Sequence, residues 1–416
     1  MAKLAINGGP SLGAGYKVQW PIITQEDEQA VLQAVRLNQL GGLGDENTHP
    51  NFIFERQFAA YHSARYGVIM ANGTVTLETA LRACGVQPGD EVLVPAITFV
   101  ASASAIVSVG AVPVFVDVDE TTCQISPTAA AQAITTRTKA IIAVHYGAYC
   151  FDIDALSEIA RQHHLALIED CAHAQGTFWK GRGVGSWGTC GSFSFQHSKS
   201  LVGGEGGIVI TDDTDLFERI SLLRNIGRRT GQTTYGHYIS ASNCRLGGLQ
   251  GAFLLSQFQR FPEQAKMRHE NVVWLEEQLR TIPGIEVTPP EPRLTQRGCY
   301  FLVLKFDPEA FGCSRSQFVA AMHAEGVNYT STGYDRPLYK EPAFARENLR
   351  GMLHPSITIP AYNELRLPNA EMWAARQVTI SHRYLSCGSR TGAELVFNAI
   401  CKIKENVGEL AVGGER

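Results

Sequence analysis

The chain has 416 residues and ten cysteines, but no two cysteines stand closer together than fourteen positions. The sequence therefore lacks the CxxC pairs on which cysteine zinc sites and dithiol redox motifs are built. Many of the cysteines stand inside apolar segments. We expect them to be buried, reduced thiols, as in proteins of the cytoplasm.

The sequence also lacks a long run of charge of either sign, and its 36 basic and 40 acidic residues give a formal charge of −4. We therefore expect neither a nucleic acid nor a membrane surface as partner. The N-terminus has no apolar core followed by a cleavage site, which predicts no secretion signal. Residues 92–116 are uncharged, but Pro95, Gly110 and Pro113 interrupt them, so we expect buried strands and a helix there instead of a membrane span.

Between about residues 65 and 210, short apolar runs alternate with amphipathic runs. This alternation predicts an α/β fold with an open, mostly parallel sheet covered on both faces, because each parallel return needs a crossover connection. The expected strands are 67–70, 91–94, 113–117, 139–145, 165–170, 191–195 and 207–211. The expected helices are 24–37, 74–84, 98–109, 127–134 and 154–163.

The pattern changes after about residue 245. A long helical stretch, 249–282, contains Pro262, which we expect to break or kink it. An alternating stretch at 299–306 and helices at 316–325 and 391–409 follow. We therefore expect a large domain with the N-terminal segment over residues 1–260, and a smaller α+β C-terminal domain over 261–416.

Polar groups of several different kinds stand where the predicted strands end. Gly73-Thr74 opens a helix, where free backbone N–H groups favour a phosphate. Asp170 ends a buried strand, and Lys199 precedes the glycine-rich segment 203–207. Taken alone, Gly73-Thr74 would be interpreted as an ordinary helix cap, Asp170 as a structural carboxylate and Lys199 as a surface lysine. With the aromatic Phe99, they form the set that pyridoxal phosphate (PLP) requires: a phosphate cradle, a carboxylate for the ring nitrogen, a lysine and a stacking ring.

Two other motifs in the sequence suggest a different ligand. Residues 183–188 (GVGSWG) match GxGxxG, but they follow a turn and lead into a strand, whereas the dinucleotide fingerprint leaves a strand and opens a helix. The adjacent His163 and His164, and the aspartates at 212–215, lack the spacing of metal ligands, so we expect no metal site.

The sequence resembles the DegT/DnrJ/StrS family of fold-type I, PLP-dependent sugar and cyclitol aminotransferases, from about Trp20 to Leu410. The motifs that carry the resemblance are NGT with LETAL, GDEVLVPAITFVASASA, VPVFVDVD, IIAVHYG, IEDCAHAQG, FSFQHSK with GGEGG, and SNCRL. Within the family, SHRYLSCGS and AHAQG look closest to scyllo-inosose aminotransferases, and the aminohydroxybenzoate synthases are also similar.

The resemblance implies roles for individual residues. Lys199 would form the Schiff base with PLP, Asp170 would pair with the ring nitrogen, and Phe99 and His173 would lie against the ring. The phosphate would be held by Gly73, Thr74, Val75 and Ser194, and by Asn243 from the neighbouring subunit. The resemblance therefore implies a homodimer with shared active sites. Four residues depart from the family pattern: Thr76, Glu78, Ser198 and Ser381.

The activity that the resemblance implies is transfer of an amino group from glutamine or glutamate to a keto-cyclitol or keto-sugar, as in the biosynthesis of aminocyclitol antibiotics. One alternative is dehydration with aromatisation, as in aminohydroxybenzoate synthases; another is a non-enzymatic regulatory relative. The segments 40–50, 227–239 and 334–340 are expected to shape the acceptor pocket, with Asn47, His49, Tyr334 and Arg336 as candidate ligands of hydroxyl groups.

Overall fold

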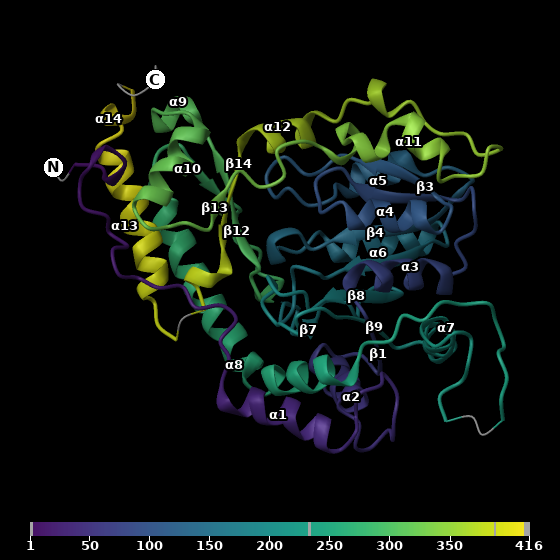
Figure 1. Cartoon of the computed structure of the whole chain (residues 1–416). Coiled ribbons are helices and arrows are strands. Elements are labelled where there is room, and N and C mark those ends of the chain that lie inside the picture. Colours follow the sequence, from purple (N-terminus) through teal and green to yellow (C-terminus); the bar gives the residue numbers. More distant parts are fainter. Residues whose placement is uncertain (1–2, 232–233, 387, 412–416) are drawn as a thin grey trace.

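The computed structural model describes residues 3–231, 234–386 and 388–411 and shows an α/β protein built around a seven-stranded sheet (Figure 1). The strand order is β1-β9-β8-β5-β4-β2-β3, and β9 alone runs antiparallel to its neighbours in this sheet. The prediction of a mostly parallel sheet is therefore confirmed. The strands are β1 (Tyr66–Met70), β2 (Glu91–Pro95), β3 (Val112–Val116), β4 (Thr138–Val144), β5 (Ala166–Asp170), β8 (Cys190–Ser194) and β9 (Gly207–Thr211).

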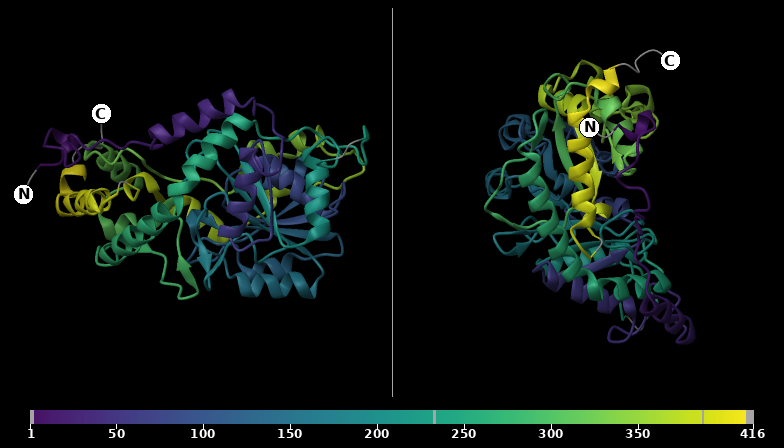
Figure 2. Two further views of the ribbon diagram at one scale, coloured as in Figure 1. Left: turned by 90° about the horizontal axis from the view of Figure 1, so that it is seen from below. Right: turned by 90° about the vertical axis from the view of Figure 1, so that its left-hand side faces the viewer.

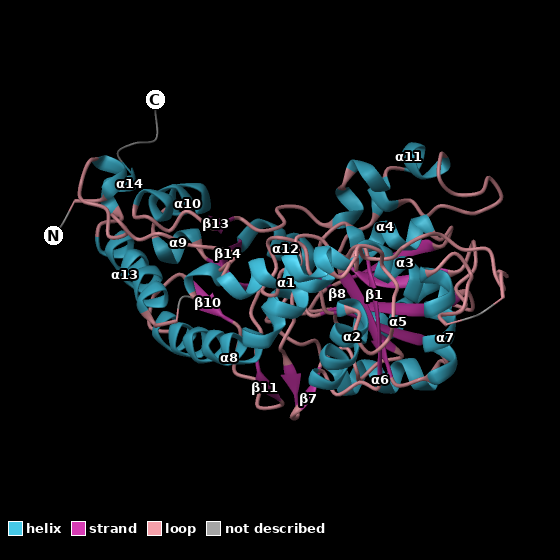
Figure 3. Ribbon diagram, turned by 60° about the horizontal axis from the view of Figure 1, so that its bottom comes forward, coloured by secondary structure: helices cyan, strands magenta, loops and turns pink. Residues whose placement is uncertain are grey.

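Helices cover both faces of this sheet (Figures 2 and 3). Successive strand residues point to opposite faces, so Met70 and Ile69 enter two different apolar clusters. One cluster receives α3 (Gly73–Ala83), α4 (Ala101–Ser108) and α7 (Thr214–Arg224). The other receives α2 (Pro50–Tyr61), α5 (Pro127–Ala133), α6 (Ile153–Gln162) and the first half of α8 (Gly248–Leu279).

A second sheet, fully antiparallel, forms the core of the C-terminal part. Its order is β10-β12-β14-β13, and helices pack against it. Its elements are β10 (Ile285–Val287), β12 (Phe301–Phe306), β13 (Thr330–Ser331), β14 (Gln377–Ser381), α9 (Pro308–Phe311), α10 (Arg315–Ala324), α13 (Thr391–Glu405) and α14 (Gly408–Ala411). The single closing helix expected over 391–409 is wrong, because the chain forms two helices there.

The N-terminal segment packs on this second sheet and not on the first. Leu4 lies in the same apolar cluster as α10 and α13, and its N–H donates to Glu409. The first described residues consequently lie beside α14 (Gly408–Ala411), as Figure 1 shows. Helix α1 (Gln25–Arg36) then leads to the large sheet, capped by Thr24 with the reciprocal hydrogen bond to Asp27.

Helix α8 connects the two parts. It continues through Pro262 for 32 residues, so the proline does not break it, and the helix changes direction along its length in Figure 1. The division at residue 260 falls inside this helix and stays a prediction. A small third sheet, β11-β6-β7, joins Leu294–Gln296, Phe178–Trp179 and Arg182–Gly183.

The segment between β13 and β14 returns to the large sheet. It contains α11 (Arg346–Arg350) and α12 (Pro368–Arg376), and Tyr362 Oη donates to the carbonyl of Pro113 in β3. Trp373 Nε1 donates to the carbonyl of Asp119. Through these two hydrogen bonds the long segment between β13 and β14 is attached to the large sheet.

The nine cysteines in the described ranges are free thiols, and six of them are buried; Cys387 lies outside the described residues. Within the same ranges no helix has both the length and the apolar character needed to cross a bilayer.

Candidate active site

The start of α3 meets the end of β8. Gly73 packs so closely on Ser194 that a Cβ atom on Gly73 would stand 2.7 Å from the Cβ of Ser194. Asn72 caps the helix, and its Oδ1 accepts the N–H groups of Thr74 and Val75 at 3.1 and 3.0 Å. These N–H groups, which the resemblance assigns to a phosphate, therefore already have one partner. The start of the helix and the hydroxyls of Thr74 and Ser194 remain as candidate groups for binding an anion at this turn.

Two of the departures from the family pattern have structural partners. Thr76 Oγ1 donates to the carbonyl of Gly73 at 2.6 Å and lies 2.7 Å from Ser192 Oγ of β8. Ser198 Oγ lies 2.7 Å from the hydroxyl of Tyr300. Thr76 thus links the start of α3 to the large sheet, and Ser198 links the lysine loop to the segment directly before β12 of the second sheet.

Asp170 ends β5 and is buried. Its Oδ2 accepts the hydroxyl of Ser102 at 2.8 Å, and its Oδ1 accepts the N–H of Ala172 at 3.1 Å. Burial raises the pKa of Asp170, while these hydrogen bonds and the charge of Lys199 oppose the rise. A buried carboxylate in this state is stabilised by a cationic partner.

Lys199 follows β8 in a loop that turns back toward the sheet. Burial lowers the pKa of its amine to about 8, and the charge of Asp170 limits this decrease. The Nζ atom lies 4.3 Å from the centre of the Tyr300 ring. A lysine with this pKa is partly neutral near neutral pH, which suits a nucleophile or a base.

His173 lies beside this lysine on the loop after β5. Its ring stacks on Tyr300 with centroids 4.7 Å apart, and its Nδ1 is buried without a hydrogen-bond partner. Burial, followed by the charge of Lys199, lowers the pKa of His173 well below its usual value. The ring is therefore neutral near pH 7.

Phe99 and Asn243 are more open to solvent. Phe99 is 52% exposed, with its ring centroid 6.5 Å from that of Tyr334. Asn243 is exposed, and its Oδ1 accepts the N–H of Arg245. Their predicted roles, against the cofactor ring and in the neighbouring subunit's site, stay predictions.

Reasoning from the sequence missed Tyr300 and Ser102. Tyr300 contacts Lys199, Ser198 and His173 from the position directly before β12, about a hundred positions after Lys199 in the chain. Ser102 donates to Asp170 from α4. No local motif marks either residue, because packing between distant segments brings them to the site: α4 on the large sheet for Ser102, and the second sheet against the first for Tyr300.

The expected acceptor ligands have mixed outcomes. Tyr334 lies at the site, 5.7 Å from the Tyr146 ring. His49 instead caps α2: its Nδ1 accepts the N–H of Asn51 and its Nε2 bonds the carbonyl of Gly41. Arg336 is exposed beside Glu341. A role for His49 in binding hydroxyl groups is therefore wrong, since backbone groups occupy both ring nitrogens.

The GxGxxG match has a structural explanation. The N–H groups of Gly185, Trp187 and Gly188 donate to the buried carboxylate of Glu169 at 2.7–2.8 Å. A side chain of the protein thus occupies the turn that a dinucleotide would need. Glu169 also accepts His145 Nε2 at 3.0 Å. His145, Glu169 and Cys171 lie close enough to suit a metal ion, but the carboxylate oxygens are already hydrogen-bonded.

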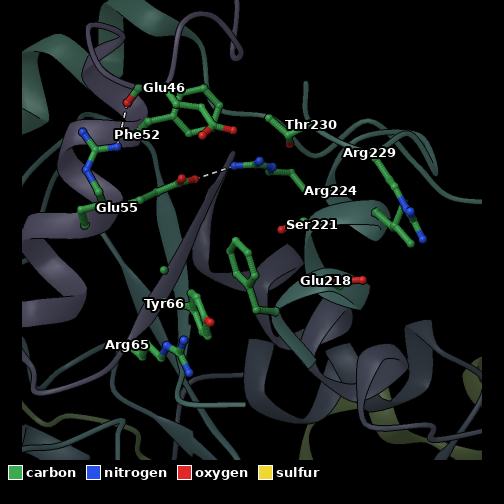
Figure 4. A pocket seen from close by; sticks show the side chains of 14 residues that line it. Glu46, Phe52, Glu55, Arg65, Tyr66, Glu218, Ser221, Arg224, Arg229 and Thr230 are labelled. Atoms are coloured by element: carbon green, nitrogen blue, oxygen red, sulfur yellow. Dashed lines mark hydrogen bonds and ion pairs between the residues drawn. The ribbon is translucent and has the colours of Figure 1, made fainter. Parts of the chain in front are cut away.

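A separate cavity of about 400 Å³ lies between α2, β1 and α7 (Figure 4). Its walls include Phe52, Tyr66 and Phe217, with the buried ion pair of Glu55 and Arg224 at 2.5 Å. Glu46 and Arg229, from two of the segments expected to shape the acceptor pocket, border this cavity. It contains none of the residues predicted to hold the cofactor.

The residues at the strand ends fit PLP. The unpartnered Nδ1 of His173 is available to a polar atom of a bound group. Only a glycine at position 73 lets the helix start approach Ser194. Asp170 offers a buried negative charge for a ring cation, and Lys199 offers an amine of lowered pKa.

Comparison with known proteins gives the same assignment. The L-glutamine:2-deoxy-scyllo-inosose aminotransferase of Micromonospora echinospora is 35% identical over 99% of this chain and all of the relative. The crystal structure of 3-amino-5-hydroxybenzoic acid synthase matches 92% of this chain and 98% of its own with a TM-score of 0.79 and 32% identity. The crystal structure of DesV of S. venezuelae matches 92% of this chain and 95% of its own chain, with a TM-score of 0.79 and 31% identity.

The model of the DegT/DnrJ/EryC1/StrS aminotransferase family matches residues 21–384, which include every residue of the site described above. The chain belongs to this family and is a PLP-dependent aminotransferase.

Proposed function

We propose that this enzyme transfers an amino group from glutamine or glutamate to the ketone of a cyclitol or sugar, in the biosynthesis of an aminocyclitol or amino-sugar natural product. The observation that carries the proposal is similarity over the full length to glutamine-dependent inosose aminotransferases. The L-glutamine:scyllo-inosose aminotransferase of Streptomyces griseus, for example, is 34% identical over 99% of both chains.

In this proposal Lys199 binds the cofactor covalently and Asp170 faces its ring nitrogen. Bound PLP supplies a cationic ring that accepts the electron pair left on the donor's α-carbon. The Asp170 carboxylate keeps a proton on the ring nitrogen by direct charge pairing. Ser102 supports this role, because its hydroxyl fixes Oδ2 and leaves the carboxylate ionised more readily.

Lys199 also moves the proton. Once the donor's amine had displaced it from the cofactor, its Nζ would be free to take a proton from the α-carbon of the donor and to give it back on the cofactor's side, which is the proton movement that transamination needs. A pKa of about 8 leaves part of the amine neutral at physiological pH and therefore able to accept that proton. The ring of His173 lies against Tyr300 and is neutral. It would share a hydrogen bond with the cofactor's phenolic oxygen without adding a charge there.

The phosphate is assigned to the start of α3 and to Ser194. Gly73, Thr74 and Val75 contribute the helix dipole, the backbone and a hydroxyl, and Phe99 covers the ring. The half-exposed Phe99 and the exposed Asn243 support a homodimer in which a second subunit completes each site. The nine free thiols support a cytoplasmic location.

Aromatising dehydration is the second candidate, because the solved 3-amino-5-hydroxybenzoic acid synthase is 32% identical to this chain. Product analysis separates the two activities. The PLP-loaded enzyme is incubated with glutamine labelled with ¹⁵N at its α-amino group and a panel of keto-cyclitols, keto-sugars and amino-substituted unsaturated ring ketones, and the products are identified by mass spectrometry. We expect a labelled amine on a saturated ring; an unlabelled aromatic amine would contradict the proposal.

A further inference from the structure

Two residues of the second sheet, one directly before β12 and one directly after β14, contact the lysine loop. The antiparallel register of the two strands places Tyr300 opposite His382, and the N–H of His382 donates to the carbonyl of Tyr300 at 3.1 Å. The side chains of both residues reach Ser198, which stands directly before Lys199 in the chain. The second sheet therefore contacts the lysine loop at the residue next to the lysine.

His382 holds the main chain of this loop. Its Nε2 lies 3.1 Å from the carbonyl oxygen of Ser198, and a carbonyl oxygen can only accept, so Nε2 carries the proton and donates. That carbonyl and the N–H of Lys199 belong to one planar peptide group. The N–H of Lys199 donates to the carbonyl of Gln196 at 2.8 Å. The peptide group that leads into the lysine is thus held at both ends, by His382 from the second sheet and by Gln196 from within the loop.

The ring of His382 is itself fixed in place. It is buried, and the ring of Trp20 from the N-terminal segment packs against it in an edge-to-face arrangement with centroids 4.5 Å apart. Ser386 Oγ lies 3.2 Å from Nδ1, the other ring nitrogen. These contacts hold the ring in one orientation, so Nε2 stays directed at the carbonyl of Ser198.

The charge state of His382 decides between a chemical and a positional role. Burial, followed by the charge of Arg268, lowers the pKa of His382 to about 3. The charge of Lys199 contributes to this decrease, so the two side chains lie within electrostatic reach of each other. The ring is therefore neutral near pH 7, and the carbonyl of Ser198 occupies its proton.

We propose that His382 is a positioning residue for Lys199, which it holds at the site by fixing the main chain of the lysine loop to the second sheet. The inference rests on the proposed function, in which Lys199 binds the cofactor and moves a proton. It also accounts for the buried amine 4.3 Å from the centre of the Tyr300 ring, because the loop that carries the amine is attached to the segment that carries this ring. A displacement of about 1 Å at a reacting group can lower a rate about 100-fold.

The test compares two amide substitutions of His382. The side-chain nitrogen of glutamine lies about as far from the backbone as Nε2 of histidine, whereas that of asparagine lies about as far as Nδ1. Both side chains are uncharged, like the histidine that they replace, so neither changes the charge near Lys199. We expect His382→Gln to keep the hydrogen bond to Ser198 and His382→Asn to lose it.

The readout is the pH midpoint for acetylation of Lys199 in the cofactor-free protein, which is expected at about 8 in the wild type because the amine is buried. In His382→Asn the loop is released and water reaches the amine. The midpoint should then rise by about one unit or more, toward the value of about 10.5 for an exposed lysine. In His382→Gln it should stay within about 0.3 units of the wild type. A role in folding alone would lower the free energy of unfolding of both variants without separating their midpoints.

His323→Asn is the matched control, because Nε2 of His323 also bonds a backbone carbonyl, that of Thr330 at 2.7 Å. This variant should keep the midpoint of the wild type. His382→Phe keeps a ring in the buried site and removes the donor, so it replaces the asparagine variant if that protein does not fold. The inference is overturned if the midpoint stays near 8 without the donor, or if His382→Gln moves it as far as His382→Asn does.

Half-reaction kinetics separate positioning from substrate binding. In PLP-loaded His382→Asn the maximal rate of the half-reaction with glutamine should fall about tenfold or more, while the glutamine concentration that gives half this rate should change less than about threefold. A change in that concentration alone would make His382 a binding residue and overturn the inference. Reduction with borohydride that attaches PLP to another lysine would instead overturn the proposed function, which the acetylation midpoints of the cofactor-free protein do not test.

Discussion

Replacing Asp170 with asparagine should make Lys199 more reactive in the cofactor-free protein. Two effects determine the pKa of Lys199: burial lowers it, and the negative charge of Asp170 raises it, with a result of about 8. Asp170→Asn keeps the shape and the hydrogen bond from Ser102 but removes the charge. The pKa of Lys199 should therefore fall below 8.

The size of the decrease can be bounded. Asp170 and Lys199 form no ion pair within 4 Å, so the interaction of about 4 kcal/mol that two unit charges have at 4 Å, with an effective dielectric constant of about 20, is an upper limit. A decrease of one pKa unit corresponds to only about 1.4 kcal/mol, so we expect one unit or more. At pH 7 the neutral fraction of the amine would then rise from about one-tenth to about one-half, and its acylation should become about fivefold faster.

The assay is acetylation of the cofactor-free protein with acetic anhydride at a series of pH values, followed by mass spectrometry of the peptide that contains Lys199. The midpoint of the pH profile should move from about 8 to 7 or lower. Glu205→Gln is the control, because Glu205 is an exposed carboxylate in the same glycine-rich segment. An unchanged or higher midpoint in Asp170→Asn would refute the assignment of Asp170 as the charge facing Lys199.

Three further predictions concern the same site. Gly73→Ala should weaken PLP binding about tenfold or more in equilibrium dialysis, because the new Cβ would stand 2.7 Å from Ser194 Cβ; Gly408→Ala, with no atom within 4 Å of its added Cβ, should not. Lys199→Met should remove a pH dependence of the free energy of unfolding. The pKa of Lys199 is about 8 in the folded protein and about 10.5 in the unfolded chain, so the unfolded chain holds the extra proton between these two pH values. The free energy of unfolding of the cofactor-free wild type should therefore rise by up to about 3 kcal/mol from pH 8 to pH 10.5. Chemical denaturation of both proteins across that range measures this, and parallel curves would contradict the buried state of Lys199. Tyr300→Leu should lower the acetylation midpoint of Lys199 by up to about one unit, because it removes a cation–π contact, whereas Tyr300→Phe should leave the midpoint in place.

The sequence predicted those parts of the fold that depend on local periodicity. Strand β9 was predicted with its observed bounds, and α3 and α6 began and ended within one residue of expectation. Asp170 and Lys199 were predicted as site residues because parallel strands bring their carboxyl ends to one edge, where ligands bind. These predictions needed only the spacing of apolar residues and the punctuation between them.

What the sequence did not reveal depends on contacts between distant segments. Tyr300 and Ser102 reach the site through packing of α4 and β12, which no local pattern specifies. Pro262 was expected to break or kink its helix, and local sequence does not decide between the two; the helix stays continuous and changes direction, because a long helix packed at both ends tolerates the loss of one hydrogen bond. His49 was predicted as a candidate ligand of hydroxyl groups. The hydrogen bond from its ring to the carbonyl of Gly41, eight positions earlier in a loop without regular structure, is not visible in a local pattern.

The central claim is that Lys199, at the carboxyl edge of the large sheet, holds PLP. The most direct measurement is reduction of the PLP-loaded enzyme with borohydride, followed by digestion and mass spectrometry. The account predicts that the reduced cofactor is attached to the peptide containing Lys199, and that Lys199→Ala yields no labelled peptide. Attachment to another lysine in the wild-type enzyme, or labelling that persists in Lys199→Ala, would contradict it.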